Sequence, residues 1–91
     1  MTSIRDLISA NLLSNGTQII WHRKSLQVVH RALIQSDGAI QTEDGKLHKS
    51  PSGAAKHFGK KPVDGWIAWK VEATGQSLAD LRNSYLFDRK G

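Results

Sequence analysis

The sequence predicts a single α+β domain, in which three helices pack on an antiparallel sheet of three to five strands in the order α-β-β-β-α-β-α. Apolar residues recur with helical spacing near both ends of the chain, and short segments of strand-like composition lie between them. Two Asp-Gly dipeptides, typical of hairpin turns, separate these segments. The length of 91 residues suits one domain, expected over residues 3–87, with residues 88–91 as a C-terminal tail.

The first helix is predicted over residues 3–13. Ser3 suits its N-cap, Asp6 follows three residues later as in a capping box, and Asn15-Gly16 ends the segment. Its apolar face has members three or four positions apart, namely Ile4, Leu7, Ile8 and Leu12.

A meander of antiparallel strands is predicted next. The expected strands are residues 17–23, 26–35, 39–42 and 46–48. In the second of them, Leu26, Val28 and Ile34 are expected to share one face, because alternate residues of a strand point the same way.

A short helix is expected over residues 50–59. Ser50 is a favoured N-cap residue, and Pro51 suits the first turn, where its missing N–H has no helical partner to lose. Gly59 is expected to end the helix as the residue that follows its last turn.

The chain is predicted to end with a strand over residues 65–72 and a last helix. Ser77 suits the N-cap of that helix, with Asp80 as its capping-box partner. The apolar stripe of the helix is Leu78, Leu81 and Tyr85.

Tryptophans at positions 66 and 69 would point to opposite faces of a strand. Trp69 is expected in the core with Ile67 and Val71. Trp66 has two alternatives: a contact surface that stacks on a base, or a second core aromatic. Trp21, which precedes His-Arg-Lys, has the same two alternatives.

The composition excludes several classes of protein. Without cysteine the chain forms no disulfide and supports no thiolate chemistry, which fits a reducing compartment. No apolar run is long enough to cross a membrane, and the first residues do not resemble a signal peptide. A cytoplasmic location is therefore expected.

The net charge of +5 favours a polyanionic partner, most often nucleic acid. The charge is concentrated in residues 45–63, which contain His48 and His57 and no acidic residue. The same stretch holds five lysines, Lys46, Lys49, Lys56, Lys60 and Lys61. Arg31 points away from the predicted apolar face of its strand and is expected to widen this basic surface.

The sequence offers no convincing catalytic site. Ser50, His48 and Asp64 could be grouped as a triad, but no nucleophile-elbow motif accompanies them. A metal-dependent nuclease core needs two carboxylates and a lysine, and beside Asp64 and Lys70 the second acidic position is Ala68. The four histidines lack the spacing of a metal site, so a protein without cofactor or metal is expected.

The predicted start of the helix at residue 50 is an alternative kind of site. Free backbone N–H groups at a helix start suit a phosphate, and Ser50, Ser52 and Lys49 would add donors and charge. The other interpretation is an ordinary, well-capped helix start with solvated lysines. Local features leave both open.

The order and spacing of these motifs resemble the RAMA domain, the restriction enzyme and adenine methylase-associated domain, over about residues 3–86. Its Ser-Pro-Ser-x-Ala-Ala and Gly-Trp-x-x-Trp elements fall on Ser50, Pro51, Ser52, Ala54, Ala55, Gly65, Trp66 and Trp69. The residue before that glycine is often Asn in the family and is Asp64 here, which weakens any base-reading role for this position.

The resemblance implies a module that binds DNA or senses modified bases, in restriction-modification or phage and mobile-element systems, beside a methyltransferase or nuclease. We therefore predict a non-catalytic domain that binds double-stranded DNA. The expected contact residues are Arg31, Lys46, His48, Lys49, Ser50, Ser52, Lys56, Lys60, Lys61 and Trp66. The alternative is a protein–protein interaction or homodimerisation module, with an exposed apolar patch around Trp21, Trp66 and Phe87.

Overall fold

The computed structural model describes residues 2–90, and the side chains of residues 2–88. Its elements are α1 (Ile4–Ser9), β1 (Gln18–Arg23), a 3-10 helix (Lys24–Leu26), β2 (Val28–Ile34), β3 (Ile40–Thr42), β4 (Leu47–His48), α2 (Pro51–Gly59), α3 (Gly65–Ala68), β5 (Lys70–Val71) and α4 (Leu78–Lys90). The strands form one antiparallel sheet in the order β4-β3-β2-β1-β5. The predicted α+β class is confirmed. The five strands lie within the predicted number, and the four α-helices are one more than predicted.

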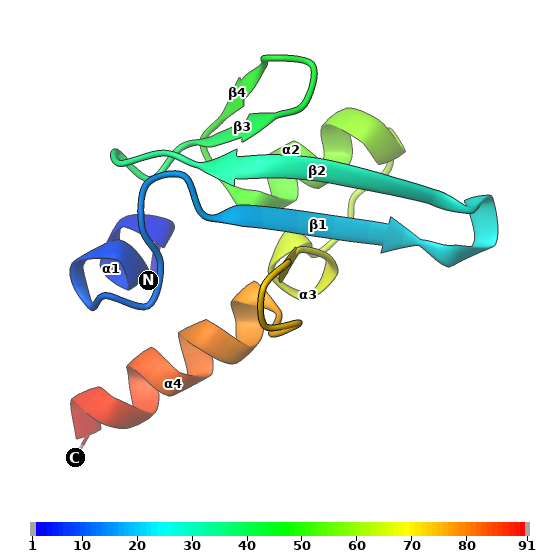
Figure 1. Ribbon diagram of the computed structural model, residues 1–91. Helices are drawn as coiled ribbons and strands as arrows, with labels where there is room; N and C mark the ends of the chain where they lie inside the picture. Colours follow the sequence, from blue (N-terminus) through cyan, green and yellow to red (C-terminus); the bar gives the residue numbers. More distant parts are fainter. Residues whose placement is uncertain (1, 91) are drawn as a thin grey trace.

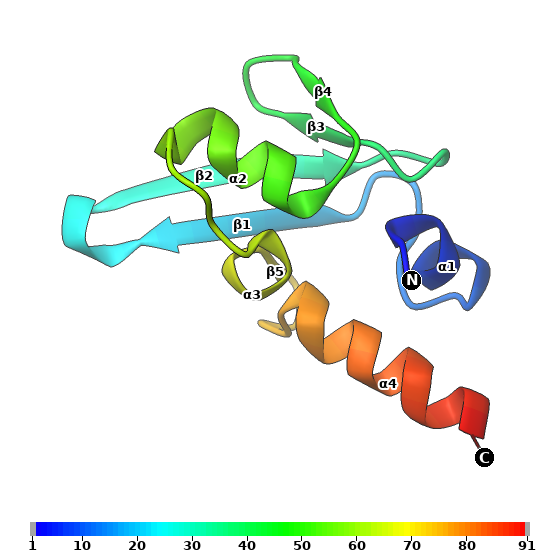
Figure 2. The same cartoon turned by 180° about the vertical axis from the view of Figure 1, so that it is seen from behind.

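The helices leave one face of the sheet open. The sheet stands in front of α2 and α3 in Figure 1, whereas the reverse view in Figure 2 shows these helices in front of it. Strand pairing aligns Ile19 with Ala32 and Val71 on the helix-covered side. The opposite side, here called the open face, carries Ile20, Arg31, Leu33, Leu47 and Lys70.

The core lies between the covered face and the helices. Its completely buried large side chains include Leu7, Ile19, Ile34, Ile40, Trp69 and Leu78, from both ends and the middle of the chain. Trp69 is a core residue, as predicted, and its indole Nε1 donates to the Pro51 carbonyl oxygen at 3.1 Å. The only buried polar or charged residue in the described part of the chain is Thr42.

Helix α1 is shorter than predicted. The Ser3–Asp6 capping box is present, but Asn11 adopts a left-handed conformation with a φ of 62° and interrupts the helix. The amide groups of Leu12 and Leu13 donate to the Leu7 carbonyl oxygen, so Leu13 still reaches the core.

The second strand also begins later than predicted. Leu26 belongs to the 3-10 helix that joins β1 and β2, and it is 54% exposed. Val28 is exposed as well, and Ile34 alone of the three expected face residues is buried. The hairpin extends beyond the area that the helices cover, so its outer apolar residues have no core to enter.

The prediction of one strand over residues 65–72 is wrong, because its first half is helix α3. The Asp64 carboxylate accepts a hydrogen bond from the Trp66 amide at 3.0 Å and caps this helix. Gly65 packs directly against the backbone of Pro51, and strand pairing is limited to β5. Tertiary contacts therefore override the strand-like composition of this segment.

Helix α2 begins as predicted, with Ser50 as N-cap and Pro51 in the first turn. Gly59 is helical and does not follow the last turn as expected; Lys60 is the left-handed residue there, with a φ of 58°. A Cβ on Gly59 would lie 3.4 Å from the Trp21 ring, so this glycine allows close packing instead.

Helix α4 begins with the predicted capping box. The Ser77 amide donates to the Asp80 carboxylate, and the Asp80 amide donates to the Ser77 hydroxyl, each at 3.0 Å. Leu78 and Leu81 are buried, and Tyr85 packs against the core. The helix continues through residues 88–90, the segment expected as a tail.

Candidate nucleic-acid interface

The outward side of α2 is basic. Pro51, Ala54 and Ala55 turn inward and are buried, which leaves Lys56 and Lys60, four positions apart, on the exposed side. Lys61 follows directly and is also exposed. Three of the predicted contact lysines therefore lie together at the C-terminal half of this helix.

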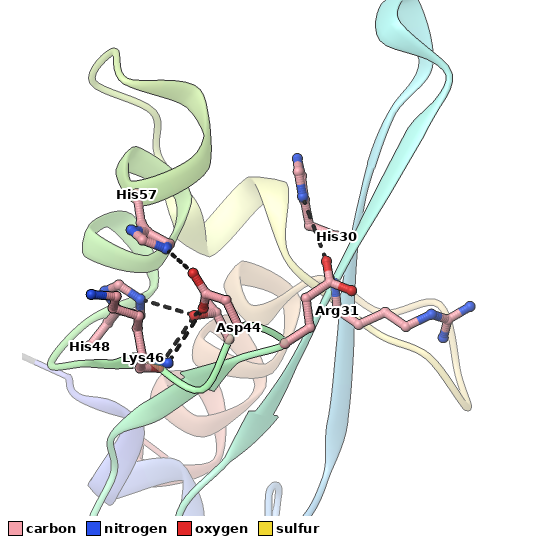
Figure 3. Close-up of polar contacts among 8 residues, drawn as sticks. His30, Arg31, Asp44, Lys46, His48 and His57 are labelled. Atoms are coloured by element: carbon pink, nitrogen blue, oxygen red, sulfur yellow. Dashed lines mark hydrogen bonds and ion pairs between the residues drawn. The ribbon is translucent and has the colours of Figure 1, made fainter.

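Lys49 lies at the other end of α2, and Lys46 lies in the β3–β4 turn beside Asp44, which contacts His57 of α2. Both are exposed, Lys46 immediately before β4 and Lys49 immediately before the N-cap of α2. Figure 3 shows Lys46 and His48 on the side of the sheet that faces His57 of α2. Within the described part of the chain, no carboxylate oxygen lies within 4.0 Å of the side-chain ammonium group of Lys46, Lys49, Lys56, Lys60 or Lys61.

The start of α2 is occupied by contacts within the protein, which favours the interpretation of an ordinary helix start. The Ser50 hydroxyl accepts a hydrogen bond from the Gly53 amide, and the Ser52 hydroxyl accepts one from the Gly65 amide, each at 3.0 Å. A Cβ on Gly65 would lie 2.1 Å from the Pro51 carbonyl carbon, so α3 covers this turn closely. The expected open phosphate site at Ser50–Ser52 is not what the structure shows.

Trp66 matches the second of its alternatives, a core aromatic. Its ring is half-buried against the core, and the Arg82 guanidinium carbon lies 4.8 Å from the ring centroid. Because core side chains and Arg82 cover the ring, its expected role in stacking on a base has no support in this geometry. Trp21 is likewise half-buried, with its ring centroid 6.1 Å from that of Trp69.

Arg31 does not widen the basic surface of α2. It lies on the open face, on the opposite side of the sheet from that helix, and forms an ion pair with Glu72. Figure 3 shows its side chain directed away from the histidines beside α2. The structure therefore does not bring Arg31 together with the α2 lysines, because strand pairing places residue 31 on the other face.

His48 lies beside the lysines but is half-buried. Its Nε2 is 3.3 Å from the Thr42 hydroxyl, and its ring centroid is 4.8 Å from that of His57. Burial lowers the pKa of His48, and the neighbouring charge of His57 lowers it further.

Sequence reasoning missed a polar network that joins α2 to the turn between β3 and β4. Asp44 accepts hydrogen bonds from the Thr42 hydroxyl and from His57 Nε2, each at 2.5 Å (Figure 3). The Thr42 hydroxyl and then His57 hold the pKa of Asp44 well below its ordinary value. In the sequence Asp44 gives only a turn signal, because its partners lie on other elements.

His30 extends this cluster along the covered face. Its ring stacks on Phe58 of α2 at 4.0 Å, with an interplanar angle of 10°. Burial, and then the charge of Arg23, lowers the pKa of His30. Across residues 2–88, no group of three His, Cys, Asp or Glu side chains is arranged to hold a metal ion, and in the described chain no helix has the length and apolar content needed to cross a membrane.

A comparison with models of protein families assigns this chain to a family. A family model described as Restriction Enzyme Adenine Methylase Associated, RAMA, matches residues 1–91. The chain belongs to the RAMA family. A comparison with curated proteins gave no match.

In this RAMA domain the two family-like elements contact each other. The Ser-Pro-Ser element supplies the Pro51 carbonyl and the Ser52 hydroxyl, which bond to Trp69 and Gly65 of the Gly-Trp-x-x-Trp element. We call this contact, between residues 50–52 and residues 65–69, the α2–α3 junction. Asp64 caps α3 beside it, a role that Asn performs equally well, so the Asp in this RAMA chain keeps the local structure.

Proposed function

We propose that this RAMA domain is a non-catalytic module that binds double-stranded DNA through the outward side of α2 and its flanking loops. The observation that carries the proposal is a set of five exposed lysines whose ammonium groups have no carboxylate oxygen within 4.0 Å in the described part of the chain. Unpaired ammonium groups attract phosphates without first breaking an ion pair. The family's association with restriction enzymes and adenine methylases, which act on DNA, also supports a role in DNA binding.

Phosphate contacts dominate the affinity in this proposal. Lys56, Lys60 and Lys61 bind one part of the backbone, and Lys46 and Lys49 bind another. Such contacts carry no sequence information by themselves, so selectivity for sequence is slight. A modified base is then sensed by side chains next to these lysines, and a methyltransferase or nuclease partner supplies the chemistry, in a restriction-modification or mobile-element system.

The first experiment is a titration of duplex DNA at several salt concentrations. Contacts from five lysines give a slope of log K against log salt of about −4 to −5. The double variant K60E/K61E abolishes binding, whereas Lys70→Glu, an exposed lysine on the open face, leaves most of it. A flat salt dependence for the unmodified protein contradicts the proposal.

The same titration with unmodified and adenine-methylated duplexes measures base sensing. NMR shifts mapped onto residues 45–70 locate the contact surface. A ratio of affinities near one means that the module binds DNA without sensing this modification.

A protein–protein or homodimer module is the second candidate, and one observation favours it. Leu86 and Phe87 are exposed in the last part of α4, and Phe87 is 78% exposed. Association through these residues is apolar, so it survives high salt and the K60E/K61E exchange. Sedimentation of Phe87→Ser beside the unmodified protein detects it, and a monomer in both cases removes the homodimer.

A further inference from the structure

The outer end of the β1–β2 hairpin, residues 22–28, is here called the hairpin tip. Residues 24–28 are all exposed, and no helix covers them. Figure 1 shows the hairpin extending well past α2, in a molecule that measures 41 × 24 × 24 Å. An exposed leucine and valine, Leu26 and Val28, therefore lie at one extremity of the domain.

The hairpin tip is basic and free of acidic groups. No Asp or Glu occurs in residues 7–36, whereas Arg23 and Lys24 are adjacent at the turn. Neither of them has a carboxylate within 4.0 Å among the described residues. The Arg23 guanidinium carbon lies 4.9 Å from the Trp21 ring centroid, which holds that side chain along the ribbon and leaves Lys24 at the end.

Backbone pairing keeps the tip in a defined shape. The two strands pair without interruption from Gln18 and Leu33 to Arg23 and Val28. The turn closes with Gln27 in the left-handed conformation, and its amide donates to the Lys24 carbonyl oxygen at 3.1 Å. A preformed ribbon loses little conformational entropy when it binds.

The hairpin is fixed to the C-terminal end of α2. Phe58 stacks on His30, and Gly59 packs against Trp21, so Lys60 and Lys61 lie at the side of the ribbon. Trp21 lies two positions before Arg23, the last residue of β1, and Lys24 follows Arg23 directly. Figure 2 shows the C-terminal end of α2 beside the hairpin, with the hairpin tip extending past it.

We propose that the hairpin tip enters the major groove of the DNA whose backbone the α2 lysines bind. This inference rests on the proposed function and adds a second contact to it. A major groove about 12 Å wide admits a two-stranded ribbon without distortion, whereas a minor groove about 6 Å wide would first have to be widened. Lys24 then contacts a phosphate or a guanine edge, and Leu26 contacts apolar groups such as the thymine methyl.

Matched variants test the two contacts separately. Lys24→Ala makes the salt slope less negative by about one, whereas Leu26→Ser lowers affinity about tenfold and leaves the slope unchanged. The controls are Lys70→Ala and Leu47→Ser, the same exchanges at exposed positions of the open face, and both bind as the unmodified protein does. Thermal unfolding of all four verifies that the fold is kept.

Groove occupancy is measured by competition and by modified duplexes. A minor-groove ligand leaves binding unchanged, and bulky substituents at C5 of the pyrimidines reduce it. Displacement by the minor-groove ligand overturns the major-groove assignment. If Lys24→Ala and Leu26→Ser bind normally while K60E/K61E does not, the hairpin inference is wrong and the proposed function stands. If the unmodified protein does not bind duplex, both are wrong.

Discussion

The α2–α3 junction and the hairpin tip differ in how their side chains are used. At the junction, serine, proline, glycine and tryptophan bond to one another and are largely buried. At the tip, Lys24, Leu26 and Val28 are exposed. The junction holds the two sequence elements that resemble those of the family, whereas the tip resembles an ordinary strand end.

This difference separates residues that preserve the fold from residues available for contact. A position that touches the backbone of another element tolerates few side chains, so its motif is conspicuous in the sequence. A contact surface for a polyanion needs exposed positive charge, which many arrangements of Lys and Arg supply. In this RAMA domain the conspicuous motif serves packing, and the plainer basic residues are the better candidates for binding.

The most severe test of the junction is Gly65→Ala. Its added Cβ would lie 2.1 Å from the carbonyl carbon and oxygen of Pro51 and 2.4 Å from the Ser52 amide nitrogen, all backbone atoms that cannot move easily. We expect a loss of about 3 kcal/mol in the free energy of unfolding, measured by urea denaturation. Gly53→Ala is the control, because its Cβ meets only the Ser50 hydroxyl at 3.2 Å, and a change within about 1 kcal/mol is expected. Equal losses in the two variants would remove the special role of the junction.

The cap of α3 gives a smaller effect that separates scaffold from base reading. Asp64→Ala removes the hydrogen bond to the Trp66 amide and costs about 1 kcal/mol. Asp64→Asn keeps a capping oxygen and leaves the free energy of unfolding nearly unchanged. Chemical denaturation of both variants tests this order, and a cost from Asn as large as that from Ala would mean that the carboxylate charge itself is needed.

The Thr42–Asp44–His57 network fastens α2 on its other side and makes that contact depend on pH. The lowered pKa of Asp44 means that the folded protein favours its carboxylate over the protonated form. The stabilisation of the fold by this carboxylate is therefore complete above pH 3.8 and is lost as the pH falls further. The lowered pKa values of His30 and His48 mean that the folded protein favours their neutral rings. Their contribution to the stability of the fold is therefore complete above pH 6.5 and declines below it.

Thermal unfolding measured from pH 8 to pH 3 should therefore show two successive losses of stability. His48→Gln reduces the loss near pH 6, and Asp44→Asn reduces the loss below pH 4, because each removes the group that titrates. A variant whose stability falls with pH in the same way as the unmodified protein does would exclude its residue as a source of the dependence.

Sequence patterns predicted the parts of the fold that local interactions decide. The Ser3–Asp6 and Ser77–Asp80 capping boxes are confirmed, since their partners are three residues apart. Helix α3 could not be predicted in this way. Its residues have strand-like composition, and the contact of Gly65 with Pro51, fourteen positions away, decides its conformation.

In the candidate site too, features set by local sequence could be predicted, and features set by contacts between distant residues could not. Exposure of the lysines follows from their charge, because a lysine is rarely buried without a partner. The ion pair between Arg31 and Glu72 joins residues 41 positions apart, and the cover of Trp66 comes from Arg82 on α4. Only the folded chain brings these groups together, so the sequence could not show that Arg31 and Trp66 are already engaged.

Lys60 both ends a helix of the fold and carries a charge available for DNA contact. Its replacement by glycine tests whether these two roles can be separated. It ends α2 with a φ of 58°, a conformation that costs energy for every residue except glycine. Lys60→Gly should therefore raise the free energy of unfolding by about 0.5–1 kcal/mol. The same change removes one phosphate contact and should make the salt slope of DNA binding less negative by about one.

Lys61→Gly is the matched control, because Lys61 does not have a positive φ. It should weaken DNA binding to a similar extent without any gain in stability. If both variants bind DNA more weakly and only Lys60→Gly is more stable, a strained lysine is kept at position 60 for its charge. If Lys60→Gly instead binds DNA as the unmodified protein does, the C-terminal end of α2 is part of the scaffold, as the α2–α3 junction is.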